Sequence, residues 1–178
     1  MSIPIRYLPK HLSQRDTRKQ RKNLLKSRKM YKTGKYYQRP SVKSFKSRPS
    51  SHVRRARIEY NVNSIRPTTL LSRRTGCSLD ALEQIVNKGR GAYYSAGSRP
   101  NQTAESWGIA RLASSITGGN SSVVDYHILT DSCKKNSRAL KLATKTCRAK
   151  NRCHKQLGKS GTTKKGKTKK RQRTKKHR

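Results

Sequence analysis

The chain has 178 residues and a formal net charge of +39, because 46 Lys and Arg stand against only seven Asp and Glu. Apolar residues make up 30% of the chain, far below the ~45–50% typical of globular proteins, so we expect only part of it to bury a core. No stretch approaches the ~18 apolar residues of a membrane span, and the first residues lack the apolar segment of a secretory signal. We therefore expect a protein that is made in the cytosol.

The charge is distributed as two basic arms around a nearly neutral centre. Residues 1–58 carry nineteen Lys and Arg against one acid, and residues 132–178 carry twenty with no acid. The centre between them holds six acids against seven bases. Self-repulsion of this size opposes compaction. We therefore expect the arms to become ordered only against a polyanion or an anionic surface.

The basic N-terminal arm, residues 1–57, begins with an extended leader. Pro4 and Pro9 disfavour a helix over residues 1–12. We expect the apolar side chains of this leader to lie in a groove, either on a partner or on the protein's own core. At the other end of the arm, prolines and repeated Ser-Arg or Ser-Lys steps predict an irregular basic linker over residues 35–57.

A conditional helix is predicted between these segments, over residues 14–33. Ser13 and Asp16 have the spacing of a capping box, and Gly34 is a typical helix stop. Like charges repel one another at i,i+4, so we expect this helix to be complete only when it binds anions or packs on the core. Six of its bases are candidate contacts for nucleic acid, namely Lys19, Arg21, Lys22, Lys26, Arg28 and Lys29.

The central domain, residues 58–133, has the clearest helical pattern. A first helix is predicted over 78–88, with Ser78 as its N-cap and Gly89 as its stop. A second helix is predicted over 103–117, where a Thr is the N-cap and apolar residues recur at i, i+3, i+4 and i+7.

Two less regular segments accompany these helices. Residues 89–102 are rich in Gly and Ser and predict a loop, in which Arg90 and Arg99 are candidate phosphate contacts. A purely structural loop is the favoured interpretation. Ser122 and Asp125 have capping-box spacing and predict a shorter helix. A strand over VVDYHIL is the alternative.

The C-terminal arm is predicted to form a basic helix over residues 134–158 and a disordered Lys-rich tail over 159–178. Each phosphate that such a run neutralises releases condensed counterions, so the tail should bind duplex DNA tightly at low salt without reading its sequence. A merely solubilising tail is the alternative. The expected tail contacts are Lys164, Lys165, Lys167, Lys169, Lys170, Arg171, Arg173, Lys175 and Lys176.

Four cysteines leave three interpretations open. Reduced thiols are favoured, and a disulfide, which needs an oxidising environment, is the second possibility. The third is a zinc site, although the chain lacks the close C-x2–4-C pairs that usually build one. The weak candidate ligands are Cys133, Cys147, Cys153 and His154. We predict no metal and no cofactor, and no local signature pairs a nucleophile with a base, so we predict no enzymatic activity.

Three aromatic residues of the N-terminal arm, Tyr36, Tyr37 and Phe45, are interleaved with Lys and Arg. Aromatic rings in such a setting can stack on exposed bases. Three rings do not define a stacking platform, however, so packing on the core or on a partner is the favoured interpretation.

Three segments within residues 3–133 carry a resemblance. They are IPIRYLPKHLS with KSRKMYKTGKYYQRP, then KGRGAYYSAGSRPNQTAESWGIARLASSITGG, and then VVDYHIL. Together they resemble an uncharacterised domain family of nucleocytoplasmic large DNA viruses, of the mimivirus-like and chlorovirus-like kind. The family offers no activity to transfer, so no residue inherits a role from it. The resemblance implies the virion and the cytoplasmic virus factory as the location, and we expect the host cytoplasm or the nucleus during assembly.

The sequence thus predicts a mainly α protein in which a small central helical domain is flanked by extended or conditionally helical basic arms. The predicted function is that of a non-enzymatic virion protein that binds nucleic acid, double-stranded DNA above all, or another polyanion. Binding should be largely independent of sequence and should neutralise or condense the DNA. One alternative is a minor capsid or internal scaffold protein whose arms bind acidic shell proteins. A ribosome-like RNA-binding protein is the other.

Overall fold

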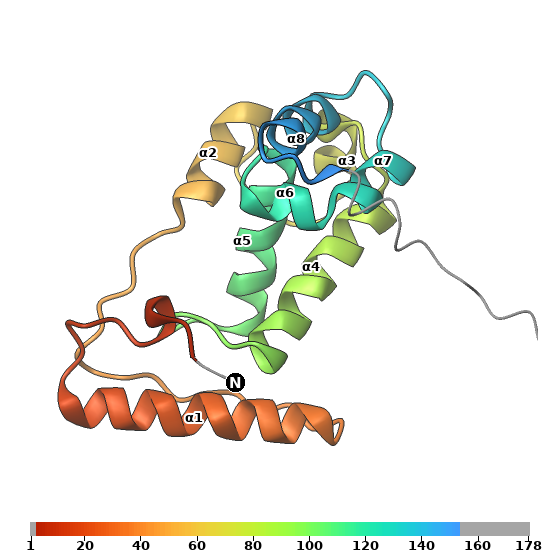
Figure 1. Cartoon of the computed structure of the whole chain (residues 1–178). Helices are drawn as coiled ribbons and strands as arrows, with labels where there is room; N and C mark the ends of the chain where they lie inside the picture. The colour runs from red at the N-terminus through yellow and green to blue at the C-terminus, as the bar shows by residue number, and fades with distance from the viewer. Residues whose placement is uncertain (1–2, 154–178) are drawn as a thin grey trace, which may run out of the picture.

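The computed structural model describes residues 3–153, and all of the regular elements in this part are helical (Figure 1). The protein is therefore mainly α, as predicted. No helix in this range is long and apolar enough to cross a membrane. In chain order the elements are η1 (Ile5–Tyr7), α1 (Gln14–Lys32), α2 (Ser51–Tyr60), α3 (Thr69–Thr75), α4 (Leu79–Ser95), α5 (Ala104–Ile116), α6 (Asn120–Val124), α7 (Tyr126–Ser132) and α8 (Arg138–Ala149).

The spine of the molecule is the pair of neighbouring helices α4 and α5 (Figure 1). They approach closely at Gly89 of α4, where a Cβ atom would lie 2.6 Å from the Cα of Gly108 on α5. Gly89 therefore serves as a contact between two helices, and α4 continues through it to Ser95. The prediction of a helix stop at Gly89, and of a loop over residues 89–95, is wrong.

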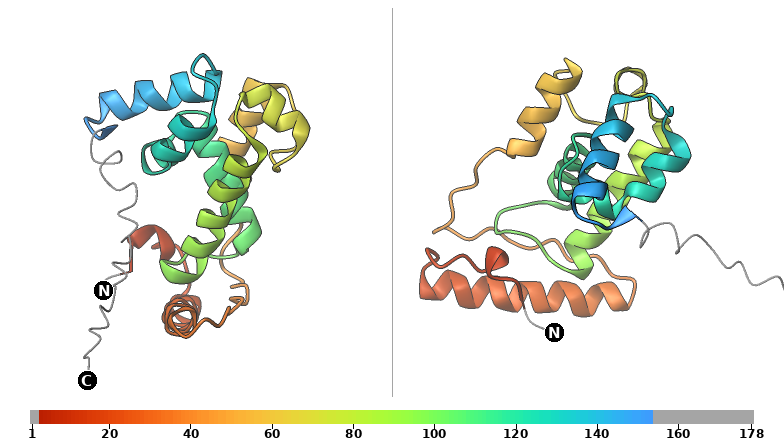
Figure 2. Two further views of the ribbon diagram at one scale, coloured as in Figure 1. Left: turned by 90° about the vertical axis from the view of Figure 1, so that its right-hand side faces the viewer. Right: turned by 45° about the horizontal axis from the view of Figure 1, so that its top comes forward.

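The hydrophobic core lies at the end of the spine where α4 begins, and helices α2, α3, α6, α7 and α8 cover that end (Figures 1 and 2). Leu82, Ile85, Leu112 and Ile116 are fully buried in it. A disulfide between Cys77 and Cys133 joins the residues that precede α4 and follow α7. Two backbone hydrogen bonds flank this disulfide, one from Ser78 N to the Ser132 carbonyl and one from Lys134 N to the Gly76 carbonyl.

The N-terminal segment covers the opposite end of the spine, where α4 ends and α5 begins (Figures 1 and 2). Leu24 of α1 is fully buried there, and a Cβ on Gly97, which has a φ of +103°, would lie 2.6 Å from its Cδ2. Tyr7 packs edge-on against Trp107 at a centroid distance of 6.0 Å. The leader was expected to pack either on a partner or on the protein's own core. In the structure it packs on the protein itself.

Helix starts were predicted well where a side-chain cap exists. Ser13 accepts a hydrogen bond from the Asp16 N–H, Ser78 accepts one from Ala81, and Thr103 accepts one from Ser106. The carboxylate of Asp16 does not complete a capping box, because it faces Ser44.

The linker prediction is correct only in part. Residues 35–50 hold no regular element, but residues 51–57 belong to α2, which places the buried side chains of Ala56 and Tyr60 on the core. Helix α2 runs across the boundary that was predicted at residue 57. The division of the chain into arm and domain stays a prediction. Helix α3 was not predicted.

The segment after α5 also differs from the prediction. Helix α6 begins at Asn120, and α7 begins at Tyr126, so Ser122 lies inside a helix and caps none. Asp125 is fully buried, and its side chain makes no capping hydrogen bond. The alternative of a strand over VVDYHIL is wrong, because all of its residues except Asp125, which lies between the two helices, belong to α6 or α7. The C-terminal helix α8 ends at Ala149, earlier than predicted.

Candidate polyanion-binding surfaces

Helix α1 buries a face that is largely polar. Asp16, Gln20, Asn23 and Ser27 are buried together with Leu24. Gln20 Nε2 donates to the carbonyl oxygens of Tyr7 and Ser98, at 3.3 and 3.4 Å, and Ser27 Oγ donates to the Tyr94 carbonyl at 3.2 Å. Buried polar groups are tolerated when they are hydrogen-bonded in this way, and each bond is directional. The contacts therefore fix the rotation of α1 about its axis.

The opposite face of α1 is exposed and cationic. The only acid of the helix, Asp16, is on the buried face, where its Oδ2 accepts hydrogen bonds from both the N–H and the hydroxyl of Ser44 at 2.7 Å. These hydrogen bonds hold the pKa of Asp16 below its usual value. A helix of this length extends for about 28 Å. Its exposed bases are Arg15, Arg18, Lys19, Arg21, Lys22, Lys26, Lys29 and Lys32.

Five of the six predicted contact residues of α1 lie on this cationic face, and one does not. Lys19 Nζ reaches the Ser41 carbonyl at 3.0 Å, and Lys26 Nζ lies 4.5 Å from the centre of the Tyr37 ring. Arg28 is half-buried and donates two hydrogen bonds to the Ala96 carbonyl, at 2.7 and 3.2 Å. Arg28 therefore acts as a structural link between α1 and the end of α4.

The irregular segment after α1 is held by Arg39 and Asn101. Asn101 accepts from the N–H of Val42 and donates to the carbonyl oxygens of Val42 and Phe45. Arg39 is buried, and its guanidinium donates to Ser27 Oγ, the Tyr93 carbonyl and Ser98 Oγ at 2.7–2.9 Å. A base inside the arm thus serves the fold, which composition alone does not indicate.

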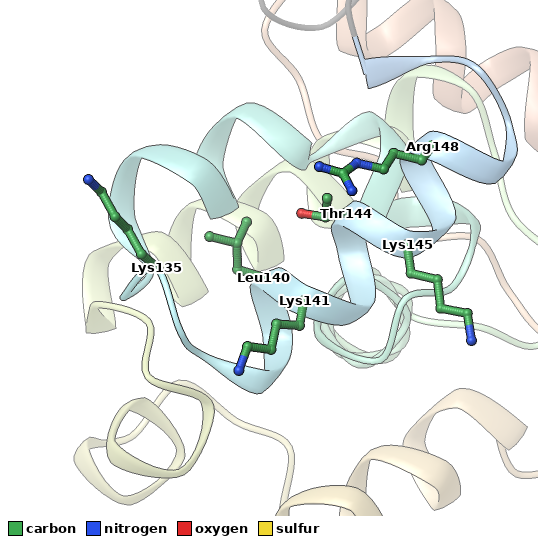
Figure 3. A pocket seen from close by; sticks show the side chains of 6 residues that line it. All are labelled: Lys135, Leu140, Lys141, Thr144, Lys145 and Arg148. Atoms are coloured by element: carbon green, nitrogen blue, oxygen red, sulfur yellow. The ribbon is translucent and has the colours of Figure 1, made fainter.

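A second cationic surface follows α8 (Figure 3). It is a groove of about 490 Å³, and no acidic residue lines it. Lys141, Lys145 and Arg148 are spaced at i, i+4 and i+7 along α8, so they share one side of the helix. Although a basic helix was predicted here, these residues were not singled out, and their spacing was the available signal. The groove is lined by Lys135, Leu140, Lys141, Thr144, Lys145 and Arg148.

The two candidate phosphate contacts near the centre differ in setting. Arg90 lies on α4, where its guanidinium pairs with Glu105 at 2.5 and 2.8 Å and donates to Asn87 Oδ1 at 2.8 Å. This ion pair already supplies the anion that the guanidinium would otherwise need. Arg99 is exposed in the loop between α4 and α5. The nine predicted tail contacts, from Lys164 to Lys176, lie outside the described residues.

The cysteines form two disulfides, Cys77–Cys133 and Cys147–Cys153, so the favoured expectation of reduced thiols is wrong. The proposed zinc ligands are thereby divided between two separate bonds. His154, the remaining candidate ligand, lies beyond the last described residue. Over residues 3–153, no three His, Cys, Asp or Glu side chains are grouped so that they could hold a metal ion.

A buried polar cluster surrounds Asp125. Its carboxylate accepts from Arg111 at 2.6 and 2.8 Å and from Ser115 at 2.8 Å, and Lys88 Nζ lies 3.1 Å away. Burial lowers the pKa of the neighbouring His127, and the charge of Lys88 lowers it further. The carboxylate joins α4 to α5 through side chains of both helices, which is a structural role.

The fold and these surfaces define a small helical protein with a helix at one end whose exposed face is cationic and free of acids, and with a cationic groove along another helix. Residues 4–125 match a family of unknown function, DUF5824, and the chain belongs to that family. The match spans α1 and the α4–α5 spine and stops before α8. No curated protein and no solved structure matches the chain.

Proposed function

We propose that this protein binds nucleic acid, duplex DNA above all, through the exposed face of α1 and the groove along α8, and that it does so as a non-enzymatic virion component of a large DNA virus. The observation that carries the proposal is the division of α1 into two faces. Its one carboxylate is turned inward onto Ser44, and its bases are turned outward. The outward face therefore attracts phosphate along its whole length.

The geometry favours phosphate contact over base readout. Duplex DNA carries one negative charge per ~1.7 Å of its axis, so a helix about 28 Å long faces many phosphates. Flexible Lys and Arg side chains on an exposed helix face supply contacts that position the protein and carry no sequence information. Because the buried face already fixes α1 against the spine, the bases are preorganised, and less entropy is lost on binding.

The test is a matched pair of charge variants in the full chain. One variant converts Arg15, Arg18, Lys22 and Lys29 of α1 to Gln, and the control converts four exposed bases elsewhere, Arg54, Arg66, Arg73 and Arg74, to Gln. Both lose the same net charge. Affinity for a fluorescent duplex of random sequence is measured by anisotropy at several salt concentrations.

We expect the α1 variant to bind more weakly than the control and to show a shallower dependence of log K on log salt concentration, by about 0.9 for each lost phosphate contact. The control should show a smaller change in slope. Equal losses in the two variants would mean that only net charge matters, and salt-independent binding would refute the proposal as a whole.

A second candidate function, a minor capsid or scaffold protein, is favoured by two exposed apolar side chains. Ile58 of α2 is 77% exposed and Leu70 of α3 is 54% exposed, so neither side chain is buried in the core. Gentle disruption of virions followed by DNase treatment separates the two functions. A DNA-neutralising protein should be released with the genome, whereas a shell protein should remain with the empty capsids.

A further inference from the structure

A groove lined by three tyrosines lies where the C-terminal ends of α1 and α4 meet. Tyr31 of α1 and Tyr94 of α4 are nearly parallel, with ring centroids 6.2 Å apart. Tyr36, from the turn after α1, packs at an angle against both rings, at 5.0 Å from Tyr94 and 6.0 Å from Tyr31. The groove has a volume of about 790 Å³.

Tyr36 differs from the other aromatic residues of its segment. Tyr37 donates a hydrogen bond to Asn23, and Phe45 stacks on His11, so these two rings pack on the protein as expected. Tyr36, in contrast, is 69% exposed. The neighbouring Tyr93 is fully buried beneath Arg39, so the core is complete without Tyr36. A large aromatic ring held on other rings yet open to water is a surface for stacking.

The remaining groove residues suit the edge of a nucleobase. Gln38 and Asn87, which carry side-chain amides, and Thr103, which carries a hydroxyl, are among the residues that line the groove. Asn87 Oδ1 already accepts from Arg90 and Thr103 Oγ1 from the Ser106 N–H, so the amide of Gln38 and the NH2 group of Asn87 are the groups that remain for a ligand. Lys32, the last residue of α1, and Lys35, which follows the turn after it, are both exposed and lie between Tyr31 and Tyr36 in the chain, where they can meet the phosphates on either side of a stacked base.

A cationic ligand does not fit this groove, although aromatic cages often bind cations. The one carboxylate in the lining, Glu105, is already paired with Arg90 at 2.5 Å. The adjoining face of α1 is cationic and would repel a second positive charge. A nucleic-acid strand fits better, because its anionic backbone matches the cationic face of α1 and its flat, uncharged base matches the tyrosine rings.

We propose that this groove binds an unpaired base of single-stranded nucleic acid, which stacks on Tyr36 while the adjacent lysines hold its backbone. This inference rests on the proposed function, because the same cationic surfaces supply the phosphate contacts. It adds a preference for a single strand that carries bases over an abasic strand of the same charge. Charge neutralisation alone would not give this preference.

The test compares two single strands of equal charge with the full-length protein. One is a fluorescent oligothymidine 12-mer, and the other is a 12-mer of abasic residues with the same phosphates. Purely electrostatic contacts cancel in the ratio of the two affinities. A stacked base contributes about a 5- to 150-fold tighter affinity. We expect the wild-type protein to prefer oligothymidine by a factor in this range.

Tyr36→Leu should abolish this preference, and Tyr36→Phe should keep it, because the ring stacks and the hydroxyl does not. Thermal unfolding checks that both variants are folded. We expect them to be, because the side chain of Tyr36 is exposed. Equal wild-type affinity for the two strands would overturn the groove proposal and leave polyanion binding intact. A preference that persists in Tyr36→Leu would overturn it as well. Failure to bind either strand would also overturn it, and failure to bind the random duplex as well would refute the proposed function itself.

Discussion

The guanidinium of Arg39 lies over the ring of Tyr93, with its Cζ 3.6 Å from the ring centroid, and it also donates a hydrogen bond to the Tyr93 carbonyl at 2.8 Å. Arg39 is only 8% exposed, and this burial lowers the pKa of its guanidinium. The charge is stabilised by the ring face and by neutral oxygen acceptors, without a carboxylate. One side chain thus ties α1, the segment after it and the end of α4 together.

Arg39→Lys should destabilise the protein by about 1–3 kcal/mol, because an ammonium group cannot reproduce a planar fork that reaches three acceptors and a ring. Urea unfolding followed by circular dichroism measures the loss. The control is Arg21→Lys on the exposed face of α1, which should change the free energy of unfolding by less than about 0.5 kcal/mol. Equal stability of the two variants would contradict the structural role of Arg39.

Asp16→Asn should lower the thermal midpoint near pH 6, and the difference from wild type should shrink as the solution is acidified. The hydrogen bonds from Ser44 hold the pKa of Asp16 below its usual value near 3.8. The stability that it contributes is therefore complete above the unfolded pKa and is lost as the pH falls through the lower, folded pKa. Asp131→Asn, at an exposed acid, is the control. A constant difference from pH 6 to pH 2 would contradict the prediction.

Gly89→Ala should destabilise the protein by about 1–3 kcal/mol, although Ala favours helices more than Gly does. The added methyl would lie 2.6 Å from the Cα of Gly108 and would force the two spine helices apart. Gly91→Ala, two residues further along α4, is the matched control, because its Cβ would meet only the Tyr31 hydroxyl at 3.3 Å. That variant should be neutral or more stable. Thermal unfolding of the pair decides the matter.

Removing the disulfide Cys77–Cys133 should destabilise the protein more than removing Cys147–Cys153. The first bond closes a chain segment with a sequence separation of 56 residues, and the second closes one of six. Loop-closure entropy then gives about 4 kcal/mol for the first and about 2 kcal/mol for the second. Paired Cys→Ala variants compared by urea unfolding test this order. A larger loss from the Cys147–Cys153 pair would reverse it.

The helices that could be predicted from the sequence are those that begin with a side-chain cap. Ser13, Ser78 and Thr103 are side-chain caps, and each does cap the helix that was expected after it. The mainly α class follows from the same signals. Gly34, with a φ of +74°, ends α1 as its position indicated. Such features act over three or four residues, so they can be recognised without knowing the tertiary structure.

The remaining features depend on partners that are distant in the chain. A glycine that ends a helix cannot be told from sequence apart from one that allows a second helix to pack closely. This explains why a helix end was wrongly predicted at Gly89. Helix α1 buries polar side chains, so its pattern gave little sign of a packed face. Arg39 resembles every other base in its arm until Tyr93, 54 residues away, is placed beneath it. The structural contact of Arg28 could not be recognised for the same reason, because Ala96, which accepts its hydrogen bonds, is 68 residues away.

Helices α1 and α8 lie at opposite ends of the α4–α5 pair, which has a consequence under the proposed function (Figure 1). Helix α4 alone measures about 26 Å, more than the width of a duplex, so the two cationic surfaces lie far apart on the molecule. If each end contacts its own duplex, one molecule bridges two neighbouring segments. Under the proposed function, added protein should draw separate duplexes into bundles instead of coating them one by one.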